Sequence, residues 1–262
     1  MKTRASGIEV NYELHGNEGA PWLVPGHSLA CSLRMWDPQI AALKDRYRIL
    51  AYDTRGHGAS EATKGAYTLD LLADDLFFLL KELKIEKTHY CGLSMGAMIG
   101  QSFALKYPGM LRSLTLADTT SRYPAEAWPL WQERIKLAET KGMEPLAQPT
   151  LERWFTEPFR ENSPAVVDRI RKLILATPVA GYVGCCHAIP KINLTARLKQ
   201  IECPILVIVG EQDPATPVAM AQEICDNAPG AKLAVLPSAA HLANLEQPEG
   251  FSRALGDFLR TT

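Results

Sequence analysis

The chain lacks several features that mark other classes of protein. Its 262 residues include 28 Lys and Arg against 29 Asp and Glu, a formal net charge of −1, and no basic run occurs. A surface that binds nucleic acid or an anionic membrane normally carries a cluster of positive charge. No apolar stretch approaches the roughly 18 residues that a membrane span requires. We therefore expect neither nucleic acid nor a membrane as a partner.

Cysteine and metal chemistry also find little support in the sequence. Six cysteines are present, but none forms a Cys-x-x-Cys pair, and the adjacent Cys185 and Cys186 are badly placed for a disulfide. We interpret all six as small hydrophobic residues. No two histidines have the spacing of metal ligands, so no metal site is predicted. The first seven residues lack the apolar core of a signal peptide, and we expect a cytoplasmic protein.

The chain does have enough hydrophobic residues, 47%, for a large buried core. In residues 8–14, apolar and polar side chains alternate, which indicates a half-exposed antiparallel strand. Later apolar runs alternate with helical patterns such as residues 68–83, where leucines recur every three or four positions. This order predicts an α/β fold, with a mostly parallel sheet flanked by helices. The expected further strands are residues 22–24, 47–52, 88–91, 111–117, 204–210 and 232–236.

Residues 121–190 break this alternation. They are rich in aromatic residues and proline, contain helical patterns at 130–138 and 166–175, and include no convincing strand. One interpretation is a set of extra helices that thicken the core. We favour an inserted helical lid, because a reaction site benefits from an apolar roof that excludes water. The α/β core would then comprise residues 1–120 and 191–262.

The sequence Gly92-Leu93-Ser94-Met95-Gly96 lies between an apolar strand and a helical pattern that Pro108 ends. This strand–turn–helix context is typical of a nucleophile elbow. Such a turn forces its central residue into a strained backbone conformation, and the flanking glycines allow the backbones to pack closely. Ser94 is therefore the candidate nucleophile.

A nucleophilic serine needs a neighbouring base and an acid that orients the base. With this kind of elbow, the expected chain order is Ser, then Asp or Glu, then His. Asp213 and His241 each follow a predicted strand, on loops at the carboxyl edge of the sheet. Glu211 is an alternative acid. His27 and His57 lie on loops at the same edge, but they precede the serine.

Acyl transfer also needs two backbone N–H groups that stabilise the developing oxyanion. Met95, directly after the candidate nucleophile and at the start of a helix, is expected to supply one of them. The second should come from the loop at residues 25–30, where Gly26 permits close backbone approach. We interpret Gly56-His57-Gly58 as a tight structural turn.

With these residues placed, the chain resembles the α/β-hydrolase superfamily over essentially its whole length. The resemblance implies the α/β-hydrolase fold with an inserted lid, and a catalytic triad of Ser94, Asp213 and His241. Such framework motifs say little about the substrate. Besides the elbow, the matching motifs are Gly26-His27-Ser28 with Met35-Trp36-Asp37, Tyr52-Asp53-Thr54-Arg55-Gly56-His57-Gly58-Ala59-Ser60, Gly210-Glu211-Gln212-Asp213 and His241-Leu242-Ala243-Asn244.

The predicted lid resembles the 3-oxoadipate enol-lactonases more narrowly. The resemblance implies Leu29 as the first oxyanion donor. It also makes Trp131, Arg134, Trp154 and Arg160 candidate contacts for a small ligand that carries a carboxylate. The matching segments are Trp131-Gln132-Glu133-Arg134, Glu152-Arg153-Trp154-Phe155-Thr156, Phe159-Arg160 and Gly181-Tyr182-Val183-Gly184-Cys185-Cys186.

Two segments depart from that family. His27-Ser28-Leu29-Ala30 stands where Asn-Ser-Leu-Gly is usual, and Pro190-Lys191 stands where Arg-Asp is usual. Because a basic residue of the lid is missing there, a relative that acts on another lactone or ester is an alternative.

We expect a serine hydrolase that opens a lactone or cleaves a small carboxylic ester through an acyl-enzyme, without a cofactor. C–C bond hydrolases and cofactor-free peroxidases use the same triad and stay open as alternatives. A ligand-binding receptor on the same fold, with vestigial hydrolysis, is an alternative from a different class. The expected partner is a small-molecule lactone or ester, and the sequence leaves open a homo-oligomer.

Overall fold

The computed structural model describes all 262 residues, and its eight strands form one sheet in the order β1-β2-β4-β3-β5-β6-β7-β8. β2 pairs antiparallel with β1 and with β4, and every other pair of neighbouring strands is parallel. The predicted antiparallel start and parallel remainder are therefore confirmed, while β1 is an addition to the prediction. The strands are β1 (Lys2–Ala5), β2 (Ile8–His15), β3 (Trp22–Gly26), β4 (Arg48–Tyr52), β5 (Thr88–Leu93), β6 (Leu111–Ala117), β7 (Ile205–Gly210) and β8 (Lys232–Leu236).

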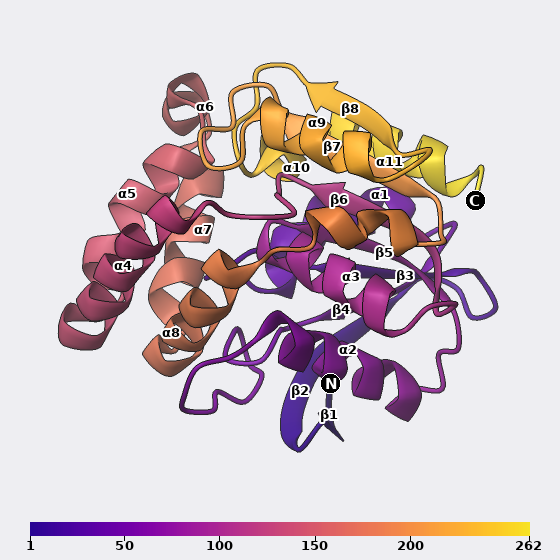
Figure 1. Ribbon diagram of the computed structural model, residues 1–262, viewed down its shortest axis with the longest axis horizontal. Coiled ribbons are helices and arrows are strands. Elements are labelled where there is room, and N and C mark those ends of the chain that lie inside the picture. Colours follow the sequence, from indigo (N-terminus) through magenta and orange to yellow (C-terminus); the bar gives the residue numbers. More distant parts are fainter.

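Helices cover both faces of the sheet (Figure 1). Successive residues of a strand point to opposite faces, so Leu23 and Val24 of β3 belong to two separate hydrophobic clusters. Helices α2 (Leu69–Glu82), α3 (Met95–Lys106) and α9 (Val218–Asn227) contribute to the cluster that contains Val24. Helices α1 (Asp37–Leu43) and α11 (Pro248–Leu259) contribute to the other. The remaining short helices of the core are η1 (Leu33–Trp36), η4 (Thr195–Gln200) and α10 (Ala243–Glu246).

The predicted leucine-rich helix forms as α2, and its start shows why. The Thr68 hydroxyl accepts a hydrogen bond from the Leu71 N–H at 3.0 Å, and Asp70 lies in the first turn. The cap satisfies one free N–H group, and the carboxylate favours the positive end of the helix. Leu72, Leu76, Leu79 and Leu80 of α2 are buried in the two hydrophobic clusters.

Residues 121–190, here called the helical insert, form five helices and no strand, and they lie together to one side of the sheet (Figure 1). The backbone of Ser121 accepts a hydrogen bond from Leu194 N–H at 2.8 Å. The chain therefore leaves and re-enters the α/β core at one place, between β6 and β7. The helices are α4 (Trp128–Lys141), α5 (Glu144–Trp154), α6 (Glu157–Asn162), α7 (Pro164–Ala176) and α8 (Val179–Ala188), with η2 (Ala125–Ala127) before them and η3 (Ile189–Lys191) after them.

The helical insert is packed closely on the core rather than suspended above it. A Cβ atom on Gly181 of α8 would lie 2.0 Å from the carbonyl oxygen of Gly56, so the two backbones touch. Gly184 accepts a hydrogen bond from the Tyr67 N–H at 3.0 Å. Side chains of the insert and of the sheet share one hydrophobic cluster.

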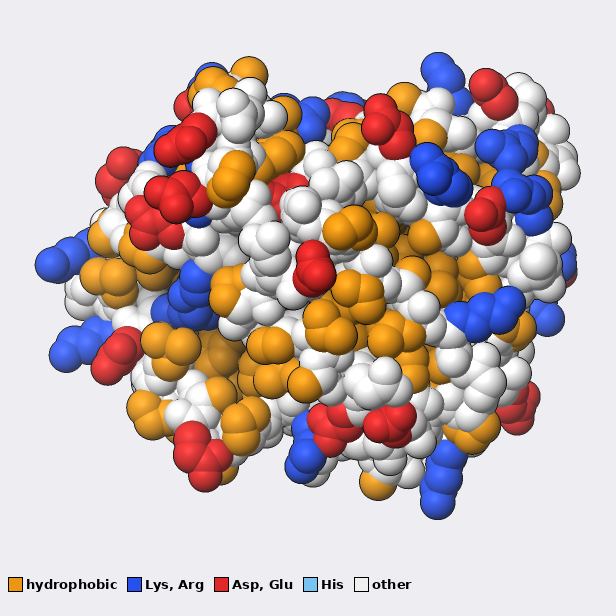
Figure 2. All heavy atoms as spheres, turned by 90° about the horizontal axis from the view of Figure 1, so that it is seen from above, with side chains coloured by type: hydrophobic (Ala, Val, Ile, Leu, Met, Phe, Trp, Pro, Cys, Tyr) orange, Lys and Arg blue, Asp and Glu red, His pale blue; other side chains and the backbone are white.

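The distribution of charge on the surface and the state of the cysteines match what the sequence led us to expect. On the face shown in Figure 2, positive and negative side chains are interspersed, with hydrophobic side chains between them. All six cysteines are free, and four of them are buried. No single helix is long and apolar enough to cross a membrane. One bent pair, Pro164–Ala176 with Val179–Lys191 at 93°, meets that test by length and composition.

Candidate active site

Ser94 lies between β5 and α3 in a strained conformation, with φ 54° and ψ −114°. A Cβ atom on Gly92 would lie 2.3 Å from the carbonyl carbon of Gly96, and one on Gly96 would lie 2.1 Å from the carbonyl oxygen of Gly26. No side chain larger than hydrogen fits at either glycine without a backbone shift. Strain of this kind persists only where the surroundings fix it, and it often marks a functional residue. The predicted elbow geometry is therefore present.

The structure brings Ser94, His241 and Asp213 together in one chain of hydrogen bonds. His241 Nε2 lies 2.9 Å from Ser94 Oγ, and His241 Nδ1 lies 2.8 Å from Asp213 Oδ2. Because a carboxylate only accepts, Nδ1 carries the proton and Nε2 is free to accept from the serine hydroxyl. Glu211, the alternative acid, is exposed and its carboxylate instead accepts from the Ser238 N–H at 3.4 Å.

Asp213 is buried, yet its surroundings favour the charged form. Its Oδ1 accepts from the N–H groups of Ala215 at 2.8 Å and Thr216 at 3.1 Å, and its Oδ2 accepts from the Thr216 hydroxyl at 2.7 Å. Burial by itself raises the pKa of the carboxyl. The charge of His241 and the hydrogen bonds from His241 and Thr216 outweigh burial, so the pKa of Asp213 lies below its usual value. An ionised carboxylate here can hold the imidazole and stabilise its charged form.

Leu29 and Met95, the two predicted oxyanion donors, lie close to Ser94 in the cavity or in the chain. The Leu29 N–H has no acceptor within the protein, and Leu29 lines the same cavity as Ser94. Met95 is the first residue of α3, where the N–H groups have no partner inside the helix. Two unpaired N–H groups near a serine hydroxyl can stabilise negative charge on a bound carbonyl oxygen.

The loop that contains Leu29 is held by two buried histidines. His57 Nε2 accepts a hydrogen bond from the Ala30 N–H at 3.0 Å, and His27 Nε2 accepts one from the Thr54 N–H at 2.9 Å. Each histidine thus binds the backbone of the loop that carries the other. Burial lowers the pKa of His27, and burial, with a smaller effect of repulsion from a protonated His27, lowers the pKa of His57 to about 3. Both rings are neutral at physiological pH, and neither contacts Ser94.

A cavity of about 200 Å³ connects the serine to the helical insert. Leu29, Ser94 and His241 form its floor, and Trp154 packs with its ring 6.2 Å from the His241 ring. The wall is mostly apolar with a few charged groups, as in most small-molecule sites. Its further lining residues are Tyr123, Ala127, Leu130, Trp131, Arg134, Arg153, Ile189, Pro214 and Ala215.

Two arginines face this cavity without a carboxylate partner. Arg134 lies over the Trp131 ring at 4.7 Å, and neither Arg134 nor Arg153 forms an ion pair within the protein. Burial and the neighbouring charge of Arg134 lower the pKa of Arg153 to about 10. The two cations repel one another in a poorly hydrated space, and a bound anion would relieve that repulsion.

Of the four predicted substrate contacts, Trp131, Arg134 and Trp154 line the cavity and Arg160 does not. The Arg160 guanidinium instead donates to the carbonyl oxygens of Phe155 at 2.6 Å and Glu152 at 3.3 Å. The chain turns after α5, where Phe155 is extended, and no residue of α6 lines the cavity. Arg153 holds the second cationic position, and the prediction missed it.

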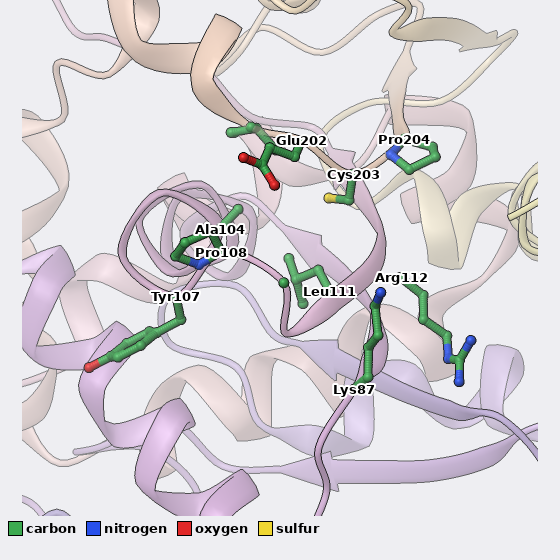
Figure 3. Close-up of a pocket in the computed structure, with 11 residues that line it drawn as sticks. Lys87, Ala104, Tyr107, Pro108, Leu111, Arg112, Glu202, Cys203 and Pro204 are labelled. Carbon is green, nitrogen blue, oxygen red and sulfur yellow. The ribbon is translucent and has the colours of Figure 1, made fainter.

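A second cavity, of about 240 Å³, lies at the opposite edge of the sheet, where β6 and β7 begin. Figure 3 shows Lys87 and Arg112 side by side on one wall, with Glu202 and Cys203 across from them. Burial raises the pKa of the Cys203 thiol to about 11, so this sulfur stays protonated. No serine, threonine or histidine lines this cavity. The cavity around Ser94 is therefore the candidate active site.

A nucleophile elbow and a hydrogen-bonded serine, histidine and aspartate at the carboxyl edge of a mostly parallel sheet define an α/β hydrolase. The model of the α/β hydrolase fold family matches residues 14–248, and the chain belongs to that family.

Several relatives match over nearly the full length. The chain is 38% identical to 3-oxoadipate enol-lactonase 2 of Acinetobacter baylyi, over 96% of this chain and 93% of the relative. The crystal structure of the enol-lactonase from Burkholderia xenovorans LB400 superposes with a TM-score of 0.96 at 37% identity, covering 99% of this chain and 100% of that chain. A thermophilic esterase from Thermogutta terrifontis, solved with malate bound, gives a TM-score of 0.94 at 30% identity, covering 100% and 98%.

Proposed function

We propose that the protein is a serine hydrolase that opens a lactone, with Ser94 as nucleophile, His241 as general base and Asp213 as the orienting acid. The observation that carries this proposal is the continuous chain of hydrogen bonds from Asp213 through His241 to Ser94, at the floor of an apolar cavity. The enol-lactonase relatives support a lactone over a linear ester as the preferred substrate.

The reaction follows from the geometry of these groups. Ser94 Oγ attacks the lactone carbonyl while His241 Nε2 takes its proton, and Asp213 stabilises the resulting imidazolium. The N–H groups of Leu29 and Met95 stabilise the oxyanion. The ring C–O bond then breaks, and its oxygen receives the proton from His241. A water molecule, deprotonated by His241, attacks the acyl-enzyme and releases the open-chain acid and Ser94.

We propose further that the helical insert, residues 121–190, is a lid that selects a substrate bearing a carboxylate. Arg134 and Arg153 offer two unpaired guanidinium groups to such a carboxylate, and Trp131 and Trp154 supply apolar walls. The malate bound to the similar esterase is a dicarboxylate, which agrees with an anionic ligand in this fold. The core, residues 1–120 and 191–262, would then carry the chemistry.

A hydrolysis screen of lactones against linear esters of matched acyl length tests the proposed function. We expect faster turnover of a lactone that bears a carboxylate, complete loss of turnover in Ser94→Ala, and covalent labelling of Ser94 by a fluorophosphonate. Labelling without steady turnover of any ester or lactone would favour a ligand-binding receptor. Hydrolysis by Ser94→Ala at a tenth of the wild-type rate would exclude Ser94 as the nucleophile.

A further inference from the structure

Both neighbours of His241 in the chain are tied, directly or through Glu246, to the helical insert. The Leu242 N–H donates to the carbonyl oxygen of Trp154 at 3.0 Å. On the other side, the Ala240 N–H donates to Glu246 Oε2, and Glu246 Oε1 accepts from the Thr156 N–H at 2.6 Å. The Glu246 carboxylate therefore bridges the loop of the candidate base and the turn between α5 and α6.

Glu246 is an unexpected residue at a buried position. Its side chain lies in α10 with 7% of the residue exposed, and it forms no ion pair. Burial raises the pKa of Glu246, while the hydrogen bonds from Ala240 and Thr156 and the charge of Arg160 oppose that effect. A carboxylate without a counter-ion is costly to bury. It does offer an acceptor to each of two N–H groups, whereas an amide would turn its own N–H₂ toward one of them.

Trp154 links the cavity, where a substrate would bind, to the loop that carries His241. Its ring lines the cavity, its carbonyl binds the residue after His241, and it lies two residues before Thr156. A displacement of this turn would thus reach His241 from both sides. The His241–Ser94 hydrogen bond depends on such placement, because a misplacement of about 1 Å in a catalytic group costs on the order of 100-fold in rate.

We propose that Glu246 is a positioning residue that makes the placement of His241 depend on the docking of the helical insert. This inference rests on the proposed function, in which His241 is the general base. The insert is then part of the catalytic support as well as a selective roof, and a ligand that moves the α5–α6 turn changes the reactivity of Ser94.

Two variants disrupt the hydrogen-bonded bridge through Glu246, one at the carboxylate and one at the N–H of Thr156. Glu246→Gln keeps the size of the side chain and replaces one acceptor by a donor. Thr156→Pro removes the N–H donor, and Thr156 already has a φ of −62°, after an extended Phe155, as proline requires. Thr156→Ala is the matched control, since it loses the hydroxyl, which caps α6 and also contacts Glu246, but keeps the N–H that binds Glu246 Oε1.

The measured quantity is the rate per functional site. The fraction of functional sites is counted with an excess of fluorophosphonate, and the rates of Ser94 labelling and of p-nitrophenyl acetate hydrolysis are divided by that fraction. We expect Glu246→Gln and Thr156→Pro to lower both rates roughly 10- to 100-fold per site, mainly in kcat, as expected for a misplaced base. Thr156→Ala should stay within about twofold of wild type, because its backbone N–H still joins the α5–α6 turn to Glu246.

Unchanged rates per site in Glu246→Gln or in Thr156→Pro would overturn the inference, and so would equal losses in Thr156→Ala and Thr156→Pro. A lower functional fraction with a normal rate per site would mean that Glu246 only stabilises the fold. Should Glu246→Gln fail to fold, Thr156→Pro decides the question. The proposed function fails on a different result, which is hydrolysis that persists in Ser94→Ala.

Discussion

Around the candidate site, the α/β core and the helical insert differ in how their polar side chains are paired. In the core, Asp213 accepts four hydrogen bonds and the rings of His27 and His57 each accept one from a backbone N–H. In the insert, Arg134 and Arg153 face the cavity without an anion. Groups satisfied within the protein hold a fixed geometry, whereas groups left unpaired gain most from a ligand. This difference supports the proposal that the core carries the chemistry and the insert selects the substrate.

The strongest test of this difference is to replace Asp213, the proposed acid of the core. We expect Asp213→Asn to lower kcat on the order of 10⁴-fold for neutral and charged substrates alike, because the amide favours the wrong imidazole tautomer. Steady-state kinetics with p-nitrophenyl acetate and with a lactone measure this loss. Glu211→Gln is the control and should keep wild-type activity, since Glu211 does not contact His241. Full activity in Asp213→Asn would mean that another group orients the base.

A change in the insert should act on one class of substrate. Arg153→Met is expected to raise KM for a carboxylate-bearing lactone roughly 10- to 100-fold, the effect of a lost charged hydrogen bond. The KM for p-nitrophenyl acetate should stay nearly constant. Arg160→Met is the matched control, because Arg160 binds carbonyl groups of the insert and does not line the cavity. Equal losses on both substrates would assign Arg153 to the structure of the insert.

The buried histidines of the core predict how stability depends on pH. The pKa of His57 is about 3 in the folded protein and about 6.5 in the unfolded chain. Below pH 6.5 the unfolded chain therefore binds the proton first, and stability falls as the pH falls. The cost is about 1.4 kcal/mol per pH unit, or about 2 kcal/mol between pH 6.5 and 5.

Urea unfolding at pH 6.5 and at pH 5 measures this effect. His57→Gln keeps an oxygen acceptor for the Ala30 N–H but cannot be protonated in this range. We expect the variant to be less sensitive to acid than wild type by about 2 kcal/mol, the His57 share of the linkage. An identical acid sensitivity in the two proteins would mean that groups other than His57, for example in the helical insert, cause the loss of stability.

The smallest effects are expected on the free energy of unfolding, when one helix cap is removed from the core and one from the insert. Thr68 caps α2 in the core and Thr156 caps α6 in the insert. Each change to alanine should cost about 1 kcal/mol of unfolding free energy. Because the insert and the sheet share one hydrophobic cluster, we expect both to appear in a single cooperative transition, followed by circular dichroism. A separate early transition in Thr156→Ala would show that the insert unfolds alone.

Prediction from sequence succeeded where a local pattern determines the structure. The strand before Gly92, the helix after Met95 and the loops after two apolar runs are all short-range features, and they placed Ser94, Asp213 and His241 at one edge. Leu29 came from the resemblance of the loop, not from periodicity. The sequence did not predict α9. For residues 121–190 it indicated helices but not how those helices pack against one another.

The sequence could not show that Arg160 lies outside the cavity, because the path of the chain after α5 depends on long-range packing. Arg153 and Arg160 both belong to segments that match the enol-lactonases, and both lie near aromatic residues. The extended backbone at Phe155 and the hydrogen bond from Thr156 to Glu246 set the turn between them. Because Glu246 is 90 residues away in the chain, no local pattern could have chosen between the two arginines.

The sequence by itself determined the elbow, the class of fold, and Ser94 and His241 of the proposed triad, with Asp213 preferred over Glu211, because strand ends and glycine turns are encoded within a few positions. Only the tertiary structure decided which arginines face the cavity and that His27 and His57 hold the loop that contains Leu29. It alone revealed that Glu246 links the insert to the loop of His241. Each of these depends on contacts between segments far apart in the chain, where packing selects one orientation among several that the local sequence allows.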